Sequence, residues 1–259
     1  MSTKYKIAVG EVIIECVIYG AGQTVVLLPG LGGDASAFTD LTQALADAGF
    51  RTVAINPRGV DASVGPLEQL TLHDLAADIA GVIEALDAAP AHLLGRAFGN
   101  RVARCVAADR PDLVRSVILL AAGGLVAPDP EAQAALQRAL RQDIPEAERL
   151  EALQMALFSP ASTPNLSALG TPRPAVAAAQ TAASRATPLA DWWTGGTAPL
   201  LVVQGLDDRL APPGNGRALR DQLGERVSLV EIPNAGHALL VEQPTVVTEA
   251  IIAFLREHE

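Results

Sequence analysis

The apolar and polar positions of the chain alternate between strand-like and helix-like patterns. Two segments in which apolar and polar residues alternate, Tyr5–Val9 and Val12–Tyr19, meet at Gly10-Glu11 and predict a β-hairpin. The chain then contains short, almost wholly apolar runs, which are typical of strands buried on both faces of a parallel sheet. These runs are Val25–Leu28, Thr52–Ile55, His92–Leu94, Val117–Leu120 and Leu200–Gln204, and Val227–Ile232 is a further strand candidate.

Helical periodicity separates these runs. It covers Phe38–Ala48, Leu72–Leu86 and Arg101–Asp109, and a last helix is expected near Thr245–His258. Thr71 and Asp74 have the spacing of a capping box, although Asp stands where Glu or Gln is usual. Alternating strand and helix signals predict an α/β fold, with a mostly parallel twisted sheet and helices on both faces.

The alternation stops between residues 126 and 191. This segment is rich in Ala, Gln, Arg and Pro and shows helical stretches near 131–142, 146–158 and 175–185, with no strand candidate. We therefore expect a helical cap at 126–191, inserted into a core domain made of residues 1–125 and 192–259.

Composition narrows the classes of partner. The formal net charge of −10 argues against a nucleic-acid partner, whose phosphates require Lys and Arg. The two cysteines, Cys16 and Cys105, lie far apart and form neither a disulfide framework nor a metal spacing. The chain shows no signal peptide and no apolar segment of membrane-spanning length. We expect a cytoplasmic protein that binds a small molecule, with no metal, cofactor or membrane partner.

The segment with the most specific chemistry is Gly95-Arg-Ala-Phe-Gly99. It follows an apolar run and precedes a helical pattern, which is the setting of a nucleophile elbow, G-x-S-x-G. The central position is Ala97, so the attacking hydroxyl is missing.

Three further loops follow predicted strands. The glycine-rich turn Pro29–Asp34 can direct backbone N–H groups at an anion or oxyanion. Asp207 and Asp208 follow the run that ends at Gln204, and His237 lies in a glycine-containing loop after Val227–Ile232. Nucleophile position, acid and histidine thus follow the chain order of the α/β-hydrolase triad.

With these motifs, nearly the whole chain resembles the α/β-hydrolase superfamily. The resemblance implies the α/β-hydrolase fold, with Ala97 at the nucleophile position and His237 as the catalytic histidine. It favours Asp208 as the acid, with Asp207 as the alternative. It also implies an oxyanion hole formed by the backbone N–H groups of Leu31 and Phe98.

Three residues near these motifs are candidates for substrate binding. Arg96 precedes the nucleophile position, where its cation can attract an anionic substrate or form a salt bridge at the end of the sheet. Trp192 and Trp193 lie where the cap returns to the core, and either line the pocket or serve as packing anchors.

Three functions remain open from the sequence. The first is a hydrolase of a small ester, lactone or amide in which engineering replaced serine by Ala97. The second is a natural serine-less enzyme in which Asp208 and His237 form a general base, for water activation, lyase chemistry or cofactor-free oxygenation. The third is a non-catalytic binding protein. Arg96 and Asn100 are unusual around an elbow, which favours a natural variant.

Overall fold

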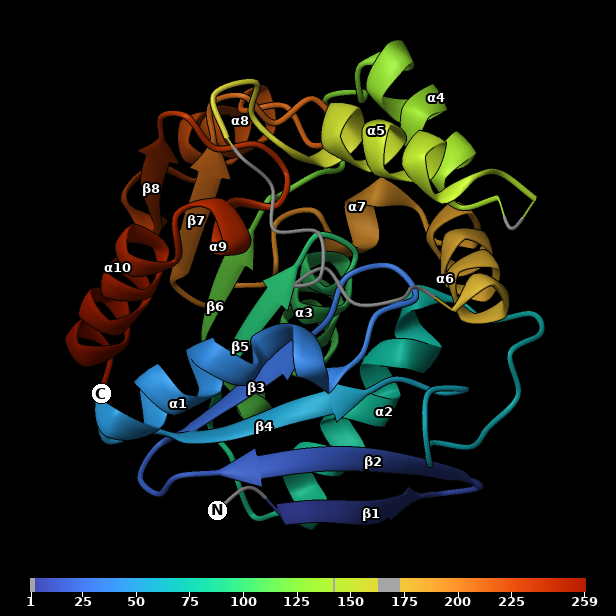
Figure 1. The fold of residues 1–259 in the computed structure, drawn as a ribbon. Helices are drawn as coiled ribbons and strands as arrows, with labels where there is room; N and C mark the ends of the chain where they lie inside the picture. Colours follow the sequence, from blue (N-terminus) through green and yellow to red (C-terminus); the bar gives the residue numbers. More distant parts are fainter. Residues whose placement is uncertain (1–2, 142, 163–172) are drawn as a thin grey trace.

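The computed structural model describes residues 3–141, 143–162 and 173–259, and their strands form one eight-stranded sheet (Figure 1). The strand order is β1-β2-β4-β3-β5-β6-β7-β8. β1–β2 and β2–β4 pair in antiparallel fashion, and the pairs from β4 to β8 are parallel. The strands are β1 (Thr3–Val9), β2 (Val12–Tyr19), β3 (Thr24–Leu28), β4 (Arg51–Asn56), β5 (Ala91–Arg96), β6 (Val114–Leu120), β7 (Leu200–Gly205) and β8 (Val227–Ile232).

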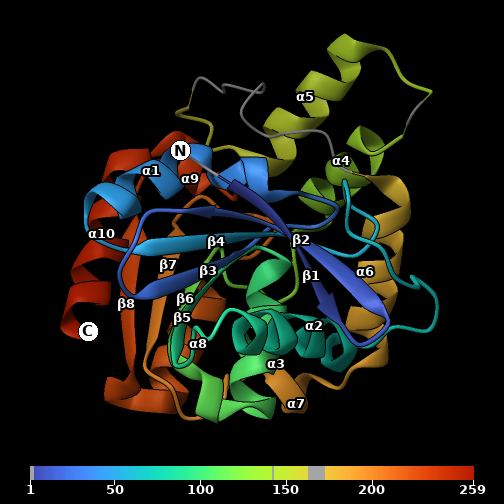
Figure 2. The same ribbon diagram turned by 90° about the horizontal axis from the view of Figure 1, so that it is seen from below.

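Helices cover both faces of this sheet, as the sequence predicts (Figure 2). On one face lie α2 (Leu72–Ala85), α3 (Gly99–Asp109) and α8 (Gly214–Leu223), and on the other α1 (Thr39–Asp47) and α10 (Pro244–Glu257). Because side chains alternate along a strand, β3 sends Val26 and Leu28 into the first core and Val25 and Leu27 into the second. This explains why the parallel strands are almost wholly apolar.

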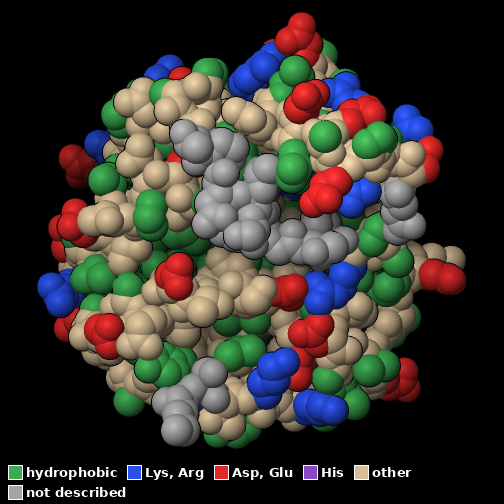
Figure 3. All heavy atoms as spheres, in the orientation of Figure 1, with side chains coloured by type: hydrophobic (Ala, Val, Ile, Leu, Met, Phe, Trp, Pro, Cys, Tyr) green, Lys and Arg blue, Asp and Glu red, His purple; other side chains and the backbone are tan. Residues whose placement is uncertain are grey.

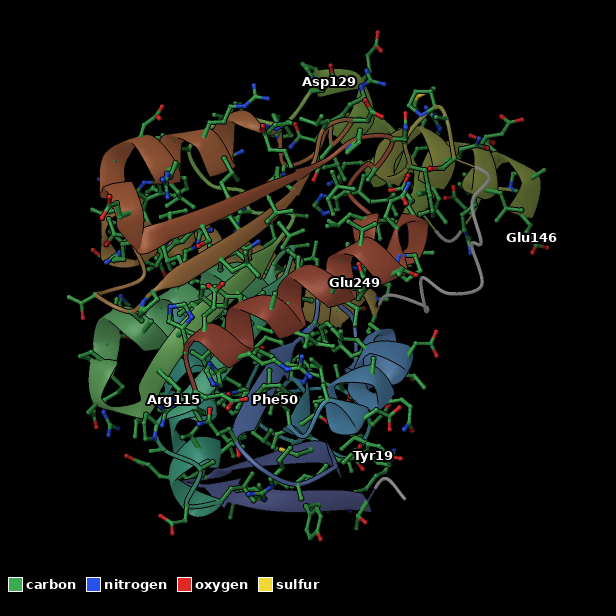
Figure 4. The ribbon with its side chains drawn as sticks, turned by 90° about the vertical axis from the view of Figure 1, so that its left-hand side faces the viewer. Tyr19, Phe50, Arg115, Asp129, Glu146 and Glu249 are labelled. Carbon is green, nitrogen blue, oxygen red and sulfur yellow. The ribbon has the colours of Figure 1, made fainter. Side chains whose placement is uncertain are left out.

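A buried polar side chain, His92, lies beside the second core. Figure 4 shows α10, with Glu249 labelled, lying across this face of the sheet, and Phe50 at its lower edge. The Phe50 ring meets the fully buried His92 ring edge-on, with 6.4 Å between centroids. His92 also contacts Ser116 Oγ at 2.7 Å and Gln23 Oε1 at 3.0 Å, so both ring nitrogens have partners.

The segment between β6 and β7 is helical in its described residues and lies at one end of the sheet (Figure 1). It contains α4 (Pro130–Ala139), α5 (Glu146–Leu157) and α6 (Pro174–Ala186), close to the expected ranges, and a short helix that the sequence did not indicate, α7 (Leu189–Trp192). α4 packs against α5, and α6 contacts α2. Part of the expected cap, residues 163–172, lies outside the described residues.

One helix of the core differs from the prediction. The sequence indicated no helix over α8, whose first turn contains Gly214 and Gly216, residues of low helix propensity. A Cβ at Gly216 would lie 2.9 Å from Leu229 Cδ1 and 3.1 Å from Val202 Cγ1. Packing against β7 and β8 therefore requires the glycine that obscured the helical pattern. In the described chain, the helices are too short or too polar to span a membrane.

Candidate active site

Ala97 lies in the sharp turn between β5 and α3. Its φ of 50° is in the left-handed region, which costs an L-residue about 1–2 kcal/mol. The Ala97 N–H donates to the Leu120 carbonyl at 2.9 Å, and its own carbonyl accepts from the Asn100 N–H at 3.2 Å. A Cβ at Gly95 would collide with the Asn100 backbone, and one at Gly99 with the Leu28 carbonyl. The two glycines therefore allow the strand and helix to approach closely enough for this turn.

His237 and Asp208 form a hydrogen-bonded pair. His237 Nδ1 lies 2.9 Å from Asp208 Oδ2 and 3.1 Å from Oδ1. The Asp208 side chain is fully buried and also accepts the backbone N–H groups of Leu210 at 2.9 Å and Ala211 at 2.7 Å. Because the carboxylate accepts a hydrogen bond from Nδ1–H, the neutral imidazole has Nε2 available as its basic nitrogen.

Asp207, the alternative acid, makes a different contact. Its Oδ2 accepts a hydrogen bond from the Ser159 hydroxyl at 2.6 Å, which joins the loop after β7 to the cap segment that follows α5. The structure thus pairs His237 with Asp208, and Asp207 with Ser159.

The backbone N–H groups of Leu31 and Phe98 are the candidate oxyanion donors. Among the described residues, neither has a hydrogen-bond partner, and both residues line the cavity that contains Ala97. The neighbouring Gly32 is held by the cap: its N–H donates to Gln180 Oε1 at 2.8 Å, and its carbonyl accepts from the Arg173 N–H at 3.0 Å. Helix α6 therefore fixes the loop that carries the Leu31 donor.

A cavity of about 380 Å³ brings these groups together. Its inner part holds Ala97, Phe98, Leu31 and His237, and its other walls come from α3, α4, α6 and the loops after β6 and β7. These walls are formed by Arg101, Ala121, Gly123, Gly124, Val126, Ala127, Pro128, Gln133, Leu136, Gln137, Thr181, Ser184, Arg185, Leu210 and Ala211. A carbonyl bound here would have a base, a place for water and unpaired N–H donors around it. In the space-filling view of Figure 3, acidic and basic side chains lie side by side over α4 and α5, the helices at the upper right of Figure 1.

The three candidates for substrate binding are not among the described residues that line this cavity. Arg96 is largely buried at the end of β5, and strand alternation places its side chain on the same face as Leu94, away from α3. Trp192 and Trp193 are only 3% and 5% exposed. Among the described lining residues of the cavity, none of the three is present. The tryptophans are packing anchors.

The tryptophans pack around a residue that the sequence analysis missed. The Arg104 guanidinium is fully buried and lies 4.6 Å from the Trp192 ring centroid and 5.1 Å from that of Trp193. Its nitrogens donate to the Asn100 side chain at 2.6 Å and to the carbonyls of Gly123 at 2.6 Å and Trp193 at 3.3 Å. Asn100 in turn donates to the Ala121 carbonyl at 3.0 Å. The unusual Asn100 thus supports a buried cation behind the elbow.

A second cluster could in principle hold a metal. The ligand atoms of His73, Cys105 and Asp109 lie within 4.8 Å of one another. His73 Nδ1 is already hydrogen-bonded to Asp109 at 2.7 Å, and its Nε2 lies 3.4 Å from Asp191. Burial raises the pKa of the Cys105 thiol, which disfavours the thiolate that binds metals. The contacts of this cluster are those of an ion-paired histidine.

Comparison with known proteins identifies the class. A family model described as the alpha/beta hydrolase fold matches residues 23–154, and one described as TAP-like protein matches residues 175–259. The chain therefore belongs to the α/β-hydrolase fold family. The strand order and the parallel sheet agree with this assignment.

Several relatives match over almost the whole chain. A protein from Mycobacterium tuberculosis named as a non-heme bromoperoxidase, BpoC, is 28% identical over 91% of this chain and 94% of its own, and its crystal structure superimposes with a TM-score of 0.79. The 2-(acetamidomethylene)succinate hydrolase of Mesorhizobium japonicum is 26% identical over 96% of this chain and 94% of its own. An esterase from Thermogutta terrifontis is 28% identical over 99% of this chain and all of its own, with a TM-score of 0.78. At the level of the family, the chain is a hydrolase-type enzyme.

Proposed function

We propose that this protein hydrolyses a small ester, lactone or amide by direct attack of water, with His237 as the general base. The observation that supports this proposal best is that His237, which is paired with Asp208, lines the same cavity as Ala97, Leu31 and Phe98. In the proposed reaction His237 accepts a proton, and the N–H groups of Leu31 and Phe98 donate hydrogen bonds to the oxyanion.

The covalent route of a serine hydrolase is closed at Ala97, because a methyl group cannot attack a carbonyl. Serine has one more heavy atom than alanine, so Ala97 leaves room near the imidazole for a water oxygen. That water attacks the substrate carbonyl carbon while His237 Nε2 takes one of its protons. The N–H groups of Leu31 and Phe98 stabilise the oxyanion. The tetrahedral intermediate then expels the alcohol or amine, which takes the proton back from His237.

Expected magnitudes make this route slower than serine catalysis but still measurable. A positioned general base contributes about 10²–10⁴-fold, and one oxyanion donor about 10²–10³-fold. Loss of the serine costs about 10⁶-fold in a serine protease. Activated substrates such as p-nitrophenyl acetate are therefore the right probes, because their good leaving group reduces what the site must supply.

The test compares p-nitrophenyl acetate turnover by the unchanged chain, His237→Ala and Ala97→Ser. We expect slow turnover by the unchanged chain that His237→Ala abolishes. If the unchanged chain is inactive and Ala97→Ser shows a burst followed by turnover, the site is that of a serine hydrolase silenced at Ala97. If both are inactive, a non-catalytic binding protein or another chemistry, such as a lyase or cofactor-free oxygenase reaction, replaces the proposal.

A further inference from the structure

The cavity beside Ala97 is basic, although the whole chain carries a net charge of −10. Among its described lining residues are two arginines, Arg101 and Arg185, and no aspartate or glutamate. The Asp208 carboxylate lies behind His237 and does not line the cavity. The local charge around the candidate reaction site is therefore opposite to that of the protein.

Arg101 lacks a compensating carboxylate. Within the described ranges, its guanidinium has no ion-pair or hydrogen-bond partner, and its charged end lies 5.5 Å from the Trp192 ring centroid. Residues 1–2, 142 and 163–172 include no Asp or Glu, so every side-chain carboxylate belongs to the described part. Burial lowers the pKa of Arg101. A cation removed from water without a counter-charge is costly.

Two other arginines show how this fold pairs a buried guanidinium when no ligand is involved. Arg58 forms a double hydrogen bond to Asp78, at 2.5 and 2.8 Å. Arg104, three residues after Arg101, donates to carbonyl groups and to the Asn100 side chain. Arg101 differs from both because its open side faces the cavity.

Ser184 on α6 is a second unsatisfied polar group of the same cavity. Its Oγ is buried and has no hydrogen-bond partner among the described residues, whereas the nearby Thr181 hydroxyl donates to the Ala177 carbonyl at 2.8 Å. Buried hydroxyl groups are normally hydrogen-bonded, so Ser184 has an unused donor. An anion beside Arg101 would supply the acceptor.

We propose that the cavity binds substrates that carry a carboxylate, with Arg101 as its ion-pair partner, Ser184 as a hydrogen-bond donor and the exposed Arg185 at the entrance. A guanidinium matches a carboxylate through two parallel N–H···O bonds. The substrate is then an acid that also contains the bond to be cleaved, and Arg101, four residues after Ala97, holds one end of it. This inference rests on the proposed function only in taking the cavity of Ala97 and His237 as the substrate site.

Binding of benzoate and of its neutral isostere benzamide tests the inference without any catalysis. Trp192 and Trp193 are the only tryptophans of the chain, and Trp192 lies against Arg101, so tryptophan fluorescence reports on the site. We expect benzoate to bind at least about tenfold more tightly than benzamide, as the loss of a charged hydrogen bond predicts. Equal affinities would overturn the inference.

Single substitutions identify the side chains that cause the preference for benzoate over benzamide. Arg101→Gln should weaken benzoate binding at least about tenfold and leave benzamide unchanged, Arg101→Lys should retain part of the preference, and Ser184→Ala should reduce it by a smaller factor. Arg217→Gln is the matched control, because Arg217 pairs with Glu231 and does not line the cavity. An unchanged benzoate affinity in Arg101→Gln contradicts the inference. If Arg101→Gln does not fold, the benzoate-to-benzamide ratio of Ser184→Ala and Arg185→Gln decides.

The same titrations in His237→Ala separate this inference from the proposed function. Benzoate binding that depends on Arg101 and persists in His237→Ala, together with no ester hydrolysis by the unchanged chain, supports the carboxylate site and rejects general-base hydrolysis. Ester hydrolysis that depends on His237, without a preference for benzoate, supports general-base hydrolysis and rejects the carboxylate site.

Discussion

The elbow around Ala97 and the loops that carry Asp208 and His237 retain different parts of an active site. At the elbow the backbone is intact: φ of Ala97 is 50°, and the Phe98 N–H is without a partner among the described residues. In the other region the side chains are intact, with His237 Nδ1 2.9 Å from a fully buried carboxylate. The elbow can stabilise charge but cannot attack, whereas His237 can move a proton.

The backbone conformation of the elbow therefore does not depend on the side chain at position 97. Its shape is set by the close approach of Gly95 to Asn100 and of Gly99 to Leu28. A serine could therefore be lost without moving the oxyanion donor. Asp208, in contrast, is held by the backbone N–H groups of Leu210 and Ala211 and loses its role if His237 is removed.

The largest expected effect is the loss of ester turnover when the imidazole of His237 is removed. Removing the imidazole in His237→Ala should lower ester turnover by about 10²–10⁴-fold, because the general base is lost. The control is His258→Ala, near the end of the chain, where the ring contacts the Phe254 carbonyl. Initial rates on p-nitrophenyl acetate measure both variants. Equal rates for the two variants would show that His237 does not act as the general base.

The elbow should show its largest effect in stability. A methyl group at Gly99 would collide with the Leu28 carbonyl, and neither backbone segment can yield easily, so Gly99→Ala should lower the free energy of unfolding by about 3 kcal/mol. Gly10→Ala is the matched control, since a Cβ there meets no atom within 4 Å and only its φ of 58° is unfavourable. Urea denaturation compares the two. A loss at Gly99 no greater than at Gly10 would contradict the close-approach account.

A third prediction uses pH to separate β5, the strand that leads to the elbow, from His237, the proposed general base. His92 lies in β5, the strand that leads to Ala97, and burial lowers its pKa to about 4. Below about pH 6.5 the unfolded chain binds a proton that the native state does not, so stability should fall as pH drops from about 6.5 to about 4, by up to roughly 1.4 kcal/mol per unit.

His92→Gln should flatten this slope in thermal unfolding at a series of pH values. Ester turnover at a pH where the protein is folded should stay the same, since His92 does not line the cavity. A His92→Gln chain with an unchanged stability slope would show that His92 does not cause the acid sensitivity.

The smallest expected effect is at position 97 itself. Ala97→Gly removes the strain of a positive φ and adds conformational freedom to the unfolded chain, so the free energy of unfolding should change by less than about 1 kcal/mol. Turnover should stay within about twofold, because the Phe98 N–H and His237 are unaffected. A large loss of activity would mean that the Ala97 methyl group takes part in substrate binding.

Much of this architecture is predictable from local patterns. The apolar runs predict the buried strands, and the capping box predicted at Thr71 and Asp74 is present at the start of α2. The elbow is visible because Gly95 and Gly99 are spaced as the turn requires. The strand order is not predictable in this way, because it depends on pairing between segments far apart in the chain.

The local pattern is least informative for side chains whose contacts depend on distant parts of the chain. A periodic pattern does not tell which arginine of α3 finds carbonyl partners: Arg104 does, and Arg101 faces the cavity. Nor does it show that Trp192 and Trp193 pack around Arg104 instead of a substrate. The sequence signal for these two roles is the pair of arginines three residues apart in α3, the helix that follows the elbow.

We expect the unchanged chain to use His237 to activate water and to form no covalent intermediate. The most direct test is a rapid-quench experiment with p-nitrophenyl acetate, in which intact mass is followed during turnover by the unchanged chain and by Ala97→Ser. We predict steady release of p-nitrophenol without a burst or an acetylated protein in the unchanged chain, and an acetyl group on the introduced serine in the Ala97→Ser variant. An acetyl-protein intermediate in the unchanged chain that forms and decays at the rate of turnover would contradict the account.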